Sequence, residues 1–361
     1  MRKTALIMAG GKGERFWPKS RISLPKQFLS FTDDGMTMLQ FTVERISPIV
    51  DIEDVYIATN SMYRDLVIQQ LPKLPKKNIL CEPIGRNTAP CIGLGAVHIS
   101  RQCEESGEDD AVMIVLASDH LIKNTDIFLD TLKCGSEAAE SGDNLVTIGI
   151  TPNYPEVGYG YIKYKKDSTL GKAYAVDAFV EKPDLDTAKK YLESGDYLWN
   201  SGMFIWKVST ILSCFQSFMP STYEGLMKIK AAVGTAEENP VLEKEFPNLE
   251  SQSVDYGIME KAKNIFILPG SFGWDDVGSW LAAGRIRKND ENGNVINGNV
   301  VSVNTSNCVI EGREKLIAAL GLNDMIVVDT EDAILISTKE NVSDIKKILA
   351  KLREQNMNQY L

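Results

Sequence analysis

The chain opens with the stretch that decides its fold, Thr4-Ala-Leu-Ile-Met-Ala-Gly-Gly-Lys-Gly-Glu-Arg-Phe-Trp-Pro18. Residues 4–9 form an apolar run of the length of a buried strand, and three glycines follow within four residues. Glycines at the end of a strand let the backbone approach phosphate oxygens closely. We therefore predict a central strand followed by an anion-binding turn at the carboxyl edge of a sheet.

The residues of this turn exclude two common nucleotide-binding loops. Phe16 occupies the third glycine position of a dinucleotide fingerprint, and no acidic residue closes the second predicted strand at 55–59. A Walker loop is excluded as well, because no Gly-Lys-Ser/Thr follows. The sequence argues against a Rossmann-type dehydrogenase and against a P-loop enzyme.

Outside this turn, the first third of the chain alternates apolar runs with helical patterns, which is typical of stacked βαβ units. Asn87 or Thr88 caps a predicted helix that has Pro90 in its first turn, and the free N–H groups at this end are expected to face the ligand edge. Besides 4–9, we predict strands at 55–59, 78–81, 111–117 and 144–148, and helices at 38–46, 61–71, 89–105 and 126–140.

The later part of the chain divides in two. From about Thr151, strands are mixed with aromatic and glycine-rich motifs, and Asp184 is expected to cap a helix that ends near Ser194. The polar stretch 288–294 suggests a boundary, so we predict a catalytic domain at 1–287 and a small β domain at 288–361. The expected elements of the small domain are strands at 300–303, 316–319, 325–328 and 333–336 and a closing helix at 342–352.

Composition narrows the function. A formal net charge of −10 argues against a nucleic-acid partner, yet five cations against one anion lie between Lys12 and Lys26. A basic loop in an acidic protein suggests a small, highly charged anion, or simply a solvated loop. Six scattered cysteines and only two histidines favour chemistry that needs neither a zinc site nor a histidine relay. No apolar run is long enough for a membrane span or a signal peptide, so we expect a cytoplasmic protein.

Seven motifs in order across the chain resemble the mannose-1-phosphate guanylyltransferases, a family of sugar nucleotidyltransferases. They are Gly10-Gly-Lys-Gly-Glu-Arg-Phe, Pro25-Lys-Gln-Phe, Glu82-Pro-Ile-Gly-Arg-Asn-Thr-Ala-Pro90, Ser118-Asp-His120, Phe179-Val-Glu-Lys-Pro183, Trp199-Asn-Ser-Gly-Met-Phe204 and Gly273-Trp-Asp-Asp-Val-Gly-Ser-Trp280. The resemblance implies a Rossmann-like, mostly parallel mixed sheet with a small left-handed β-helix-like domain. It also implies transfer of GMP from GTP to mannose 1-phosphate, which gives GDP-mannose and diphosphate.

The chemistry of that reaction fits the composition. A sugar phosphate has its second pKa near about 6 and is therefore already an ionised nucleophile at neutral pH, so no general base is needed. The obstacle is the approach of two polyanions, which Mg²⁺ and positioned cations overcome. By resemblance, Arg15 and Lys26 hold the triphosphate, and Lys182 holds the sugar phosphate.

Two aspartates are the expected Mg²⁺ ligands. Asp119 follows the apolar strand 111–117, where ligands bind in open α/β sheets, although such a residue is often only a turn or cap. The resemblance pairs it with Asp276. Neighbouring residues of an extended segment point to opposite sides, so only one of Asp275 and Asp276 should face the ion, and the family motif favours Asp276.

The resemblance also supplies the remaining site residues. Glu82 is expected to accept hydrogen bonds from guanine, or else to fix a loop whose Gly85 backbone reads the base. Tyr159 and Gly160 also fit a buried glycine-aromatic turn without a ligand. The nucleotide is assigned to Ala9, Gly10, Gly11, Gly13, Glu82, Gly85, Asn87, Thr88 and Ser118, and the sugar to Gly160, Glu181 and Asn200.

Two alternatives stay open. One is a pyrophosphorylase for another nucleotide and hexose 1-phosphate, and the other is a non-catalytic regulatory homologue, which should have lost Arg15, Lys26 or a metal aspartate. Relatives pair through the small domain, so a homodimer is expected. The chain ends before the isomerase domain of longer relatives, so we expect a single activity.

Overall fold

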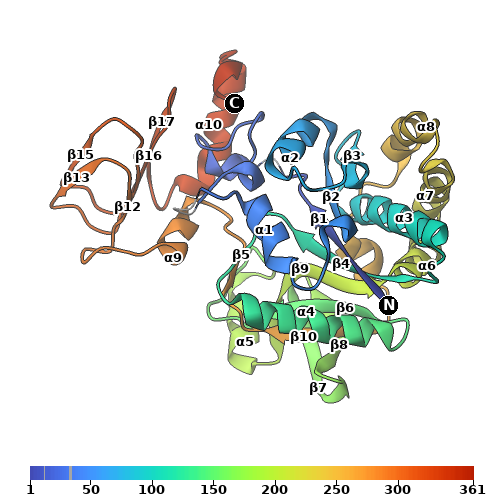
Figure 1. Ribbon diagram of the computed structural model, residues 1–361. Helices are drawn as coiled ribbons and strands as arrows, with labels where there is room; N and C mark the ends of the chain where they lie inside the picture. The colour runs from blue at the N-terminus through green and yellow to red at the C-terminus, as the bar shows by residue number, and fades with distance from the viewer. Residues whose placement is uncertain (12, 32–34) are drawn as a thin grey trace. The chain divides into compact units, whose positions relative to one another are not determined.

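The computed structural model describes residues 1–11, 13–31 and 35–361, which form two compact units (Figure 1). Unit 1 comprises residues 1–10, 42–118 and 122–274, and unit 2 comprises residues 11–41, 119–121 and 275–361. Lys12, a member of the predicted basic loop, lies outside the described residues.

Unit 1 contains a mixed sheet of nine strands within its described residues, in the order β3-β2-β1-β4-β9-β6-β10-β8-β7. Its first four strands are parallel, and β9 runs antiparallel to both β4 and β6. The strands are β1 (Arg2–Met8), β2 (Val55–Asn60), β3 (Ile79–Glu82), β4 (Ala111–Ala117), β6 (Leu145–Ile150), β7 (Tyr161–Leu170), β8 (Ala173–Val180), β9 (Tyr197–Lys207) and β10 (Ile265–Gly270).

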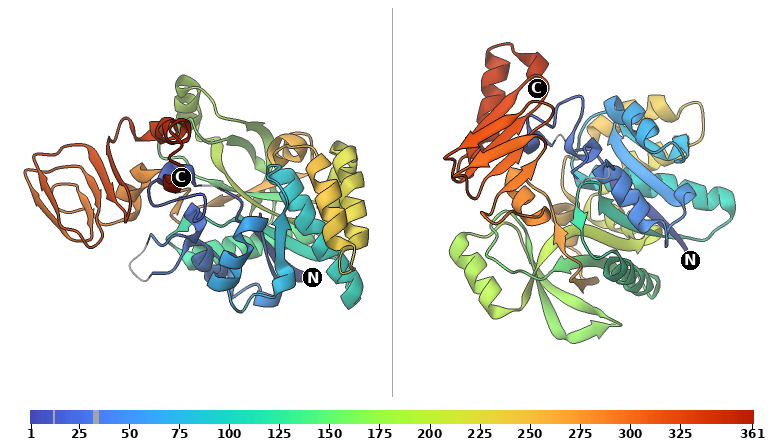
Figure 2. Two further views of the ribbon diagram at one scale, coloured as in Figure 1. Left: turned by 90° about the horizontal axis from the view of Figure 1, so that it is seen from above. Right: turned by 60° about the vertical axis from the view of Figure 1, so that its left-hand side comes forward.

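Helices cover both faces of this sheet. Gly95 lets α3 pack closely, since an added Cβ there would lie 2.7 Å from Leu6 of β1. On the other face, Gly135 of α4 packs on Ile205 of β9. The helices between residues 38 and 245, of which α1 begins in unit 2, are α1 (Met38–Ile46), α2 (Arg64–Gln70), α3 (Thr88–Ser106), α4 (Thr125–Glu140), α5 (Leu185–Ser194), α6 (Val208–Phe218), α7 (Pro220–Ala232) and α8 (Glu238–Glu245). Figure 2 shows α6 to α8, in yellow tones, alongside α3.

The predicted elements of the first third are confirmed to within a few residues. The predicted first strand, 4–9, is β1, and α3 begins directly after Asn87, whose side chain accepts from Thr88 N at 2.8 Å. The predicted cap of α5 is confirmed as well, because Asp184 accepts from Thr187 N. Strong local signals, a capping side chain before an amphipathic run, account for this agreement.

Unit 2 contains a β-helix-like array of short strands (Figure 2). Strands β12, β14 and β16 pair in parallel, as do β13 and β15. The elements are β12 (Val295–Asn297), β13 (Val300–Val303), β14 (Val309–Glu311), β15 (Ile317–Leu320), β16 (Met325–Asp329), β17 (Ile334–Thr338), α9 (Ala283–Ile286) and α10 (Ile345–Glu354). The expected fold class, an α/β sheet with a small β-helix-like domain closed by a helix, is confirmed.

The core of unit 2 joins distant parts of the sequence. Phe16 packs against Phe31 and Trp280, with ring centroids 5.0 and 5.3 Å apart. The same buried cluster contains Val309 of β14 and Leu349 of α10. Residues that follow the glycine-rich turn therefore share a hydrophobic core with the C-terminal strands. The domain boundary between residues 287 and 288 divides the chain only by position in the sequence, and it stays a prediction.

The structure also contains elements that the sequence analysis did not identify. Helices α6 to α8 lie within residues 208–245, and β12 and β14 have three residues each. In addition, β5 (Leu121–Ile122) and β11 (Trp274–Asp275) are two-residue strands. Strands of two or three residues carry too little periodicity to be recognised. Across the described ranges, no helix is long and apolar enough to cross a membrane.

Candidate active site

The end of β1 brings Gly10 to Glu82 within unit 1. Ala9 continues the sheet, because its N–H donates to Ala58 O at 2.7 Å. A Cβ added at Gly10 would lie 3.4 Å from Glu82 Oε2, so the carboxylate faces the glycine backbone. Burial raises the pKa of Glu82 to about 7, against the opposing effect of a hydrogen bond with Cys91. A protonatable acceptor therefore lies beside the predicted nucleotide turn.

The first residues of α3 form hydrogen bonds with other residues of unit 1. Asn87 has a φ of 70° and accepts from Thr88 N, and Ala89 N donates to Gln252 O at 3.1 Å. Thr88 Oγ1 accepts in turn from Val254 N at 2.9 Å. Two N–H groups that the sequence analysis assigned to a ligand thus have partners within the protein.

Two further nucleotide candidates differ in exposure. Gly85 is exposed, and an added Cβ would meet nothing within 4 Å. Ser118 is buried, and its backbone N–H donates to Met8 O at 3.1 Å. Gly85 therefore lies at the surface of unit 1, whereas Ser118 is part of its sheet.

The predicted sugar residues converge in unit 1. A Cβ at Gly160 would lie 2.7 Å from Glu181 Oε2 and 3.5 Å from Asn200 Cβ. Asn200 N donates to Gly160 O at 2.8 Å, and Lys182 Nζ lies 2.7 Å from Glu181 Oε1. The hydrogen bond to Glu181 raises the pKa of Lys182, which remains a cation. The structure thus brings together all four residues, and Lys182 adopts a left-handed φ of 42° that is uncommon for a side-chain-bearing residue.

One polar residue of this cluster was not predicted from the sequence. Asp255 accepts from Asn200 Nδ2 at 2.7 Å. It begins a π-helical turn at Asp255–Met259, a feature frequent at functional sites. The sequence carries no local signal for such a turn, although the polar stretch 250–253 shortly before it could have drawn attention to this segment.

A second cluster, in unit 2, surrounds the buried Lys26. Its ammonium lies 2.9 Å from Asp119 Oδ2 and 2.8 Å from the backbone oxygen of Asp276. Gly13 makes this possible, because a Cβ there would lie 2.5 Å from Lys26 Cβ. Gly13 also has a φ of 62°, which favours glycine. The two predicted metal aspartates are thereby joined through one cation.

Arg15 and Gly11 complete this cluster. Gly278 lies beside both Arg15 and Asp276, since an added Cβ would be 2.8 Å from Asp276 Oδ2 and 3.4 Å from Arg15 Nη1. Gly11 O accepts from Gln27 Nε2 at 3.0 Å, which ties the glycine turn to the segment of Lys26. Guanidinium, ammonium and carboxylate groups are therefore gathered around one turn.

Asp275 is held by two partners within unit 2. Arg285 Nε lies 2.6 Å from Asp275 Oδ2, and Asp275 Oδ1 accepts from Val277 N at 2.8 Å. A carboxylate with both oxygens engaged, by a guanidinium and by a backbone N–H, is a poor candidate for a metal ligand. This pairing supports the choice of Asp276 over Asp275.

The carboxylate oxygens of Asp119 and Asp276 suit a hard divalent cation that takes other ligands from the substrate. Among the described residues, no group of three or more histidine, cysteine, aspartate or glutamate side chains could hold a metal ion alone. Burial tends to raise the pKa of Asp119, but Lys26 and His120 outweigh this effect, so its pKa is lowered and the side chain is ionised. Two carboxylates leave room for phosphate oxygens and waters, the usual pattern for Mg²⁺.

Comparison with family models identifies the class of protein. Residues 4–293 match the nucleotidyl transferase family, and residues 298–352 match the MannoseP isomerase/GMP-like beta-helix domain. The chain belongs to the nucleotidyl transferase family. Members of this family generally use a divalent metal.

Individual relatives narrow the class. The chain is 38% identical to a mannose-1-phosphate guanylyltransferase of Salmonella montevideo, over 99% of this chain and 75% of the relative. It is 39% identical to one of Escherichia coli, over 98% and 75%. A Thermus thermophilus crystal structure described as a mannose-1-phosphate geranyltransferase matches with a TM-score of 0.85 and 33% identity, over 98% of this chain and 100% of that one. Within its family, the chain groups with the mannose-1-phosphate guanylyltransferases.

Proposed function

We propose that this enzyme transfers GMP from GTP to mannose 1-phosphate, giving GDP-mannose and diphosphate. The observation that carries the proposal is the position of Lys26 Nζ, within hydrogen-bonding distance of the Asp119 carboxylate and of the backbone oxygen of Asp276. A buried cation between two acidic residues, with Arg15 beside Gly278, is suited to a polyphosphate and its metal. The names of the two relatives indicate guanine as the base and mannose as the sugar.

In this proposal the residues of the chain bind and orient, and they transfer no proton. The ionised phosphate of the sugar attacks the α-phosphorus of GTP, and diphosphate leaves. Arg15 and Lys26 hold the triphosphate, and Lys182 holds the sugar phosphate. Glu181, Asn200 and Gly160 orient the hexose, and with it the phosphate oxygen that attacks.

We propose Mg²⁺ as the metal, held by Asp119 and Asp276. The ion would neutralise phosphate charge when bound. The carboxylate of Asp119, whose pKa is lowered, is ionised and available as a hard oxygen ligand at neutral pH. Lys26 would keep this carboxylate oriented through its hydrogen bond at 2.9 Å.

The guanine base is assigned to the neighbourhood of Glu82. An ionised carboxylate accepts from the N1–H and the 2-amino group of guanine, a donor pair that adenine lacks. The remaining assigned nucleotide contacts are Ala9, Gly10, Gly11, Gly13, Gly85, Asn87, Thr88 and Ser118. A cytoplasmic location stays a prediction from the sequence.

We further propose a homodimer formed through unit 2. Large apolar side chains of this unit, from β13, β15, β17 and the residue before β15, are between 52% and 73% exposed: Val301, Val303, Leu316, Leu320, Ile334 and Ile336. An exposed apolar face is a frequent site of protein association. A second copy of this chain is the occupant that the family resemblance favours.

A release panel tests the proposed reaction. The purified protein is incubated with each of ATP, CTP, GTP and UTP against mannose, glucose and galactose 1-phosphate, and diphosphate is measured. We expect the highest kcat/KM for GTP with mannose 1-phosphate. A higher value for another pair would reassign the substrates, and no release from any pair would favour a non-catalytic homologue.

A further inference from the structure

Asn200 has its side-chain amide fixed at both ends. Its Nδ2 donates to Asp255 Oδ1 at 2.7 Å, and its Oδ1 accepts from Gly202 N at 3.1 Å. A flipped amide would direct its oxygen at a carboxylate and its NH₂ group at an N–H, so only one orientation satisfies both neighbours. That orientation leaves one N–H hydrogen and one oxygen lone pair for a hydroxyl group.

The segment that carries Asp255 also contacts the start of α3. Gln252 O accepts from Ala89 N at 3.1 Å, and Val254 N donates to Thr88 Oγ1 at 2.9 Å. Val254 is fully buried, which anchors the segment in the core of unit 1. Residues 252–255 therefore join the predicted nucleotide loop to the predicted sugar residue over four consecutive positions.

The surroundings of Asp255 make the hydrogen bond from Asn200 strong. Burial raises the pKa of Asp255, the bond from Asn200 opposes that effect, and Glu181 raises the pKa further while Lys182 lowers it. A carboxylate that is partly removed from water forms a stronger bond with the amide N–H that donates to it than a fully solvated carboxylate does. Loss of this carboxylate would free the Asn200 amide to rotate.

We propose that Asp255 is a positioning residue that fixes the Asn200 amide for the hydroxyls of the hexose 1-phosphate, and that residues 252–255 hold this amide in register with the start of α3. The inference deepens the proposed function and rests on it for the identity of the sugar. Asp255 acts through Asn200 and is not assigned a contact with the reacting phosphates. Its effect should therefore fall on sugar use and on the choice between epimers.

Kinetics of four variants test the proposal: Asp255→Ala, Asn200→Ala, the double variant, and Asp255→Asn. We expect Asp255→Ala to raise the KM for mannose 1-phosphate about tenfold, the effect of losing one hydrogen bond to a charged group, and to change the KM for GTP less than twofold. The preference for mannose over glucose 1-phosphate should fall. Asp255→Asn keeps an acceptor oxygen and should recover most of the loss.

The double variant separates positioning from independent roles. If Asp255 acts through Asn200, Asn200→Ala with Asp255→Ala should be no worse than Asn200→Ala alone. Glu260→Gln is the matched control, because Glu260 is a carboxylate near Asp255, whereas the Asn200 amide donates to Asp255. It should leave both KM values unchanged. Additive losses, or equal rises in both KM values, would overturn the proposal.

A spectroscopic readout keeps this inference separate from the substrate assignment. In ¹⁵N-labelled protein, the Asn200 side-chain amide should exchange with water much faster in Asp255→Ala than in the wild type, while Glu260→Gln should match the wild type. An unchanged exchange rate of the Asn200 amide in Asp255→Ala would overturn the positioning role, whichever substrates the enzyme uses. Inactivity of the wild type with every sugar phosphate would contradict only the proposed function.

Discussion

At the scale of single residues, the most informative contrast lies between two adjacent aspartates. Asp275 is paired with Arg285, whereas Asp276 lies beside Gly278 and Arg15. The alternation of an extended segment predicted that only one of them faces the ion, and the family motif favoured Asp276. Because the two aspartates differ in their surroundings, the same substitution at each gives a matched pair of variants.

We expect Asp276→Asn to lower metal-dependent turnover by roughly 100-fold, because it removes a charged ligand of the proposed ion. Asp275→Asn keeps an acceptor for Val277 N and should lose no more than a few-fold. Steady-state diphosphate release at varied Mg²⁺ concentration measures both, with far-ultraviolet circular dichroism to verify folding. Equal losses in the two variants would remove Asp276 from the metal site.

Glu82 provides a pH-dependent prediction. Its pKa is raised to about 7, so below that pH the folded protein carries a neutral carboxyl that cannot accept both guanine donors. We therefore expect guanosine to bind more tightly as the pH rises through 7, and Glu82→Gln to bind weakly without this rise. Guanosine itself has no phosphate that titrates in this range, so calorimetric titration from pH 5.5 to 8.5 isolates the carboxyl.

Glu82 should also affect stability. An acid with a folded pKa above its ordinary 4.5 favours folding while protonated, and this contribution is lost as the pH rises from about 4.5 through 7. Glu82→Gln should therefore unfold at a higher temperature than the wild type at pH 8, and the difference should shrink at pH 5. A constant difference across this range would contradict the raised pKa.

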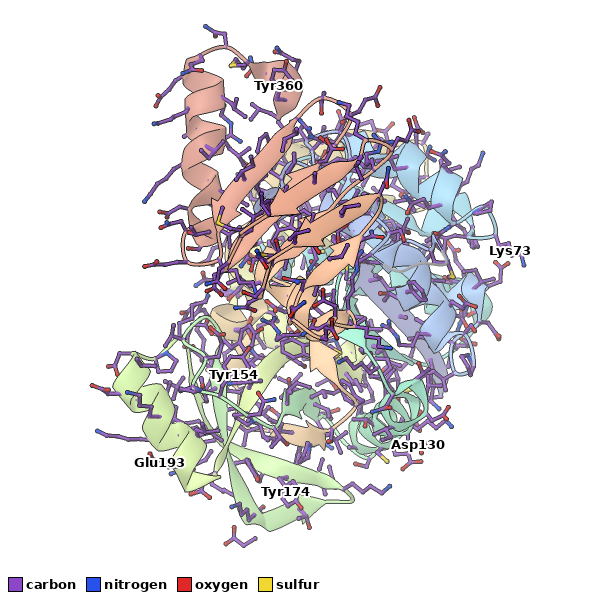
Figure 3. The ribbon with its side chains drawn as sticks, turned by 90° about the vertical axis from the view of Figure 1, so that its left-hand side faces the viewer. Lys73, Asp130, Tyr154, Tyr174, Glu193 and Tyr360 are labelled. Atoms are coloured by element: carbon purple, nitrogen blue, oxygen red, sulfur yellow. The ribbon has the colours of Figure 1, made fainter. Side chains whose placement is uncertain are left out.

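At the scale of elements, the segment that follows the glycine turn is held by the C-terminal end of unit 2. Trp17 Nε1 donates to Tyr360 O at 2.6 Å, and Arg353 Nη2 lies 3.0 Å from Glu14 Oε1. Tyr360 lies in the short turn that follows α10 (Figure 3). Trp280 Nε1 donates to Trp17 O as well. Arg15 is therefore carried on a segment whose position depends on residues more than 260 positions away.

We expect Trp17→Phe to raise the KM for GTP several-fold, because it removes the donor to Tyr360 and keeps a ring in the core. The lost hydrogen bond should also cost about 1 kcal/mol of unfolding free energy. Arg313→Gln is the control, since it breaks an exposed ion pair with Glu331 in the same unit. Steady-state kinetics measures the KM for GTP, and urea unfolding measures the stability. An unchanged KM would show that the hydrogen bond between Trp17 and Tyr360 does not contribute to GTP binding.

At the scale of the whole molecule, the proposed dimer depends on the exposed apolar face of unit 2. We expect Leu320→Lys with Ile336→Lys to convert a dimer into a monomer, because a charge in an apolar interface carries a large desolvation cost. Ile127→Lys, at an exposed isoleucine of α4, is the control and should remain dimeric. Sedimentation velocity distinguishes the two states, and a dimer that survives the double change would place the interface elsewhere.

Local sequence signals by themselves determined several features of this protein. The apolar run before Gly10, the Asn87 cap and the Asp184 cap each act through neighbouring residues, so β1, α3 and α5 were predictable. The motifs also indicated the family and most residues of the two clusters. Short-range hydrogen bonds and hydrophobic periodicity depend only on residues that are close together in the sequence, so they can be recognised without the tertiary structure.

Only the tertiary structure decided which distant residues meet. The contact of Asp255 with Asn200 joins positions 55 apart, and the contact of Lys26 with Asp276 joins positions 250 apart. Likewise, Phe16 and Leu349 belong to one core only because the chain returns to the same unit after a long excursion. Such contacts depend on which apolar faces are buried together, and that outcome is a property of the packed chain rather than of any local pattern.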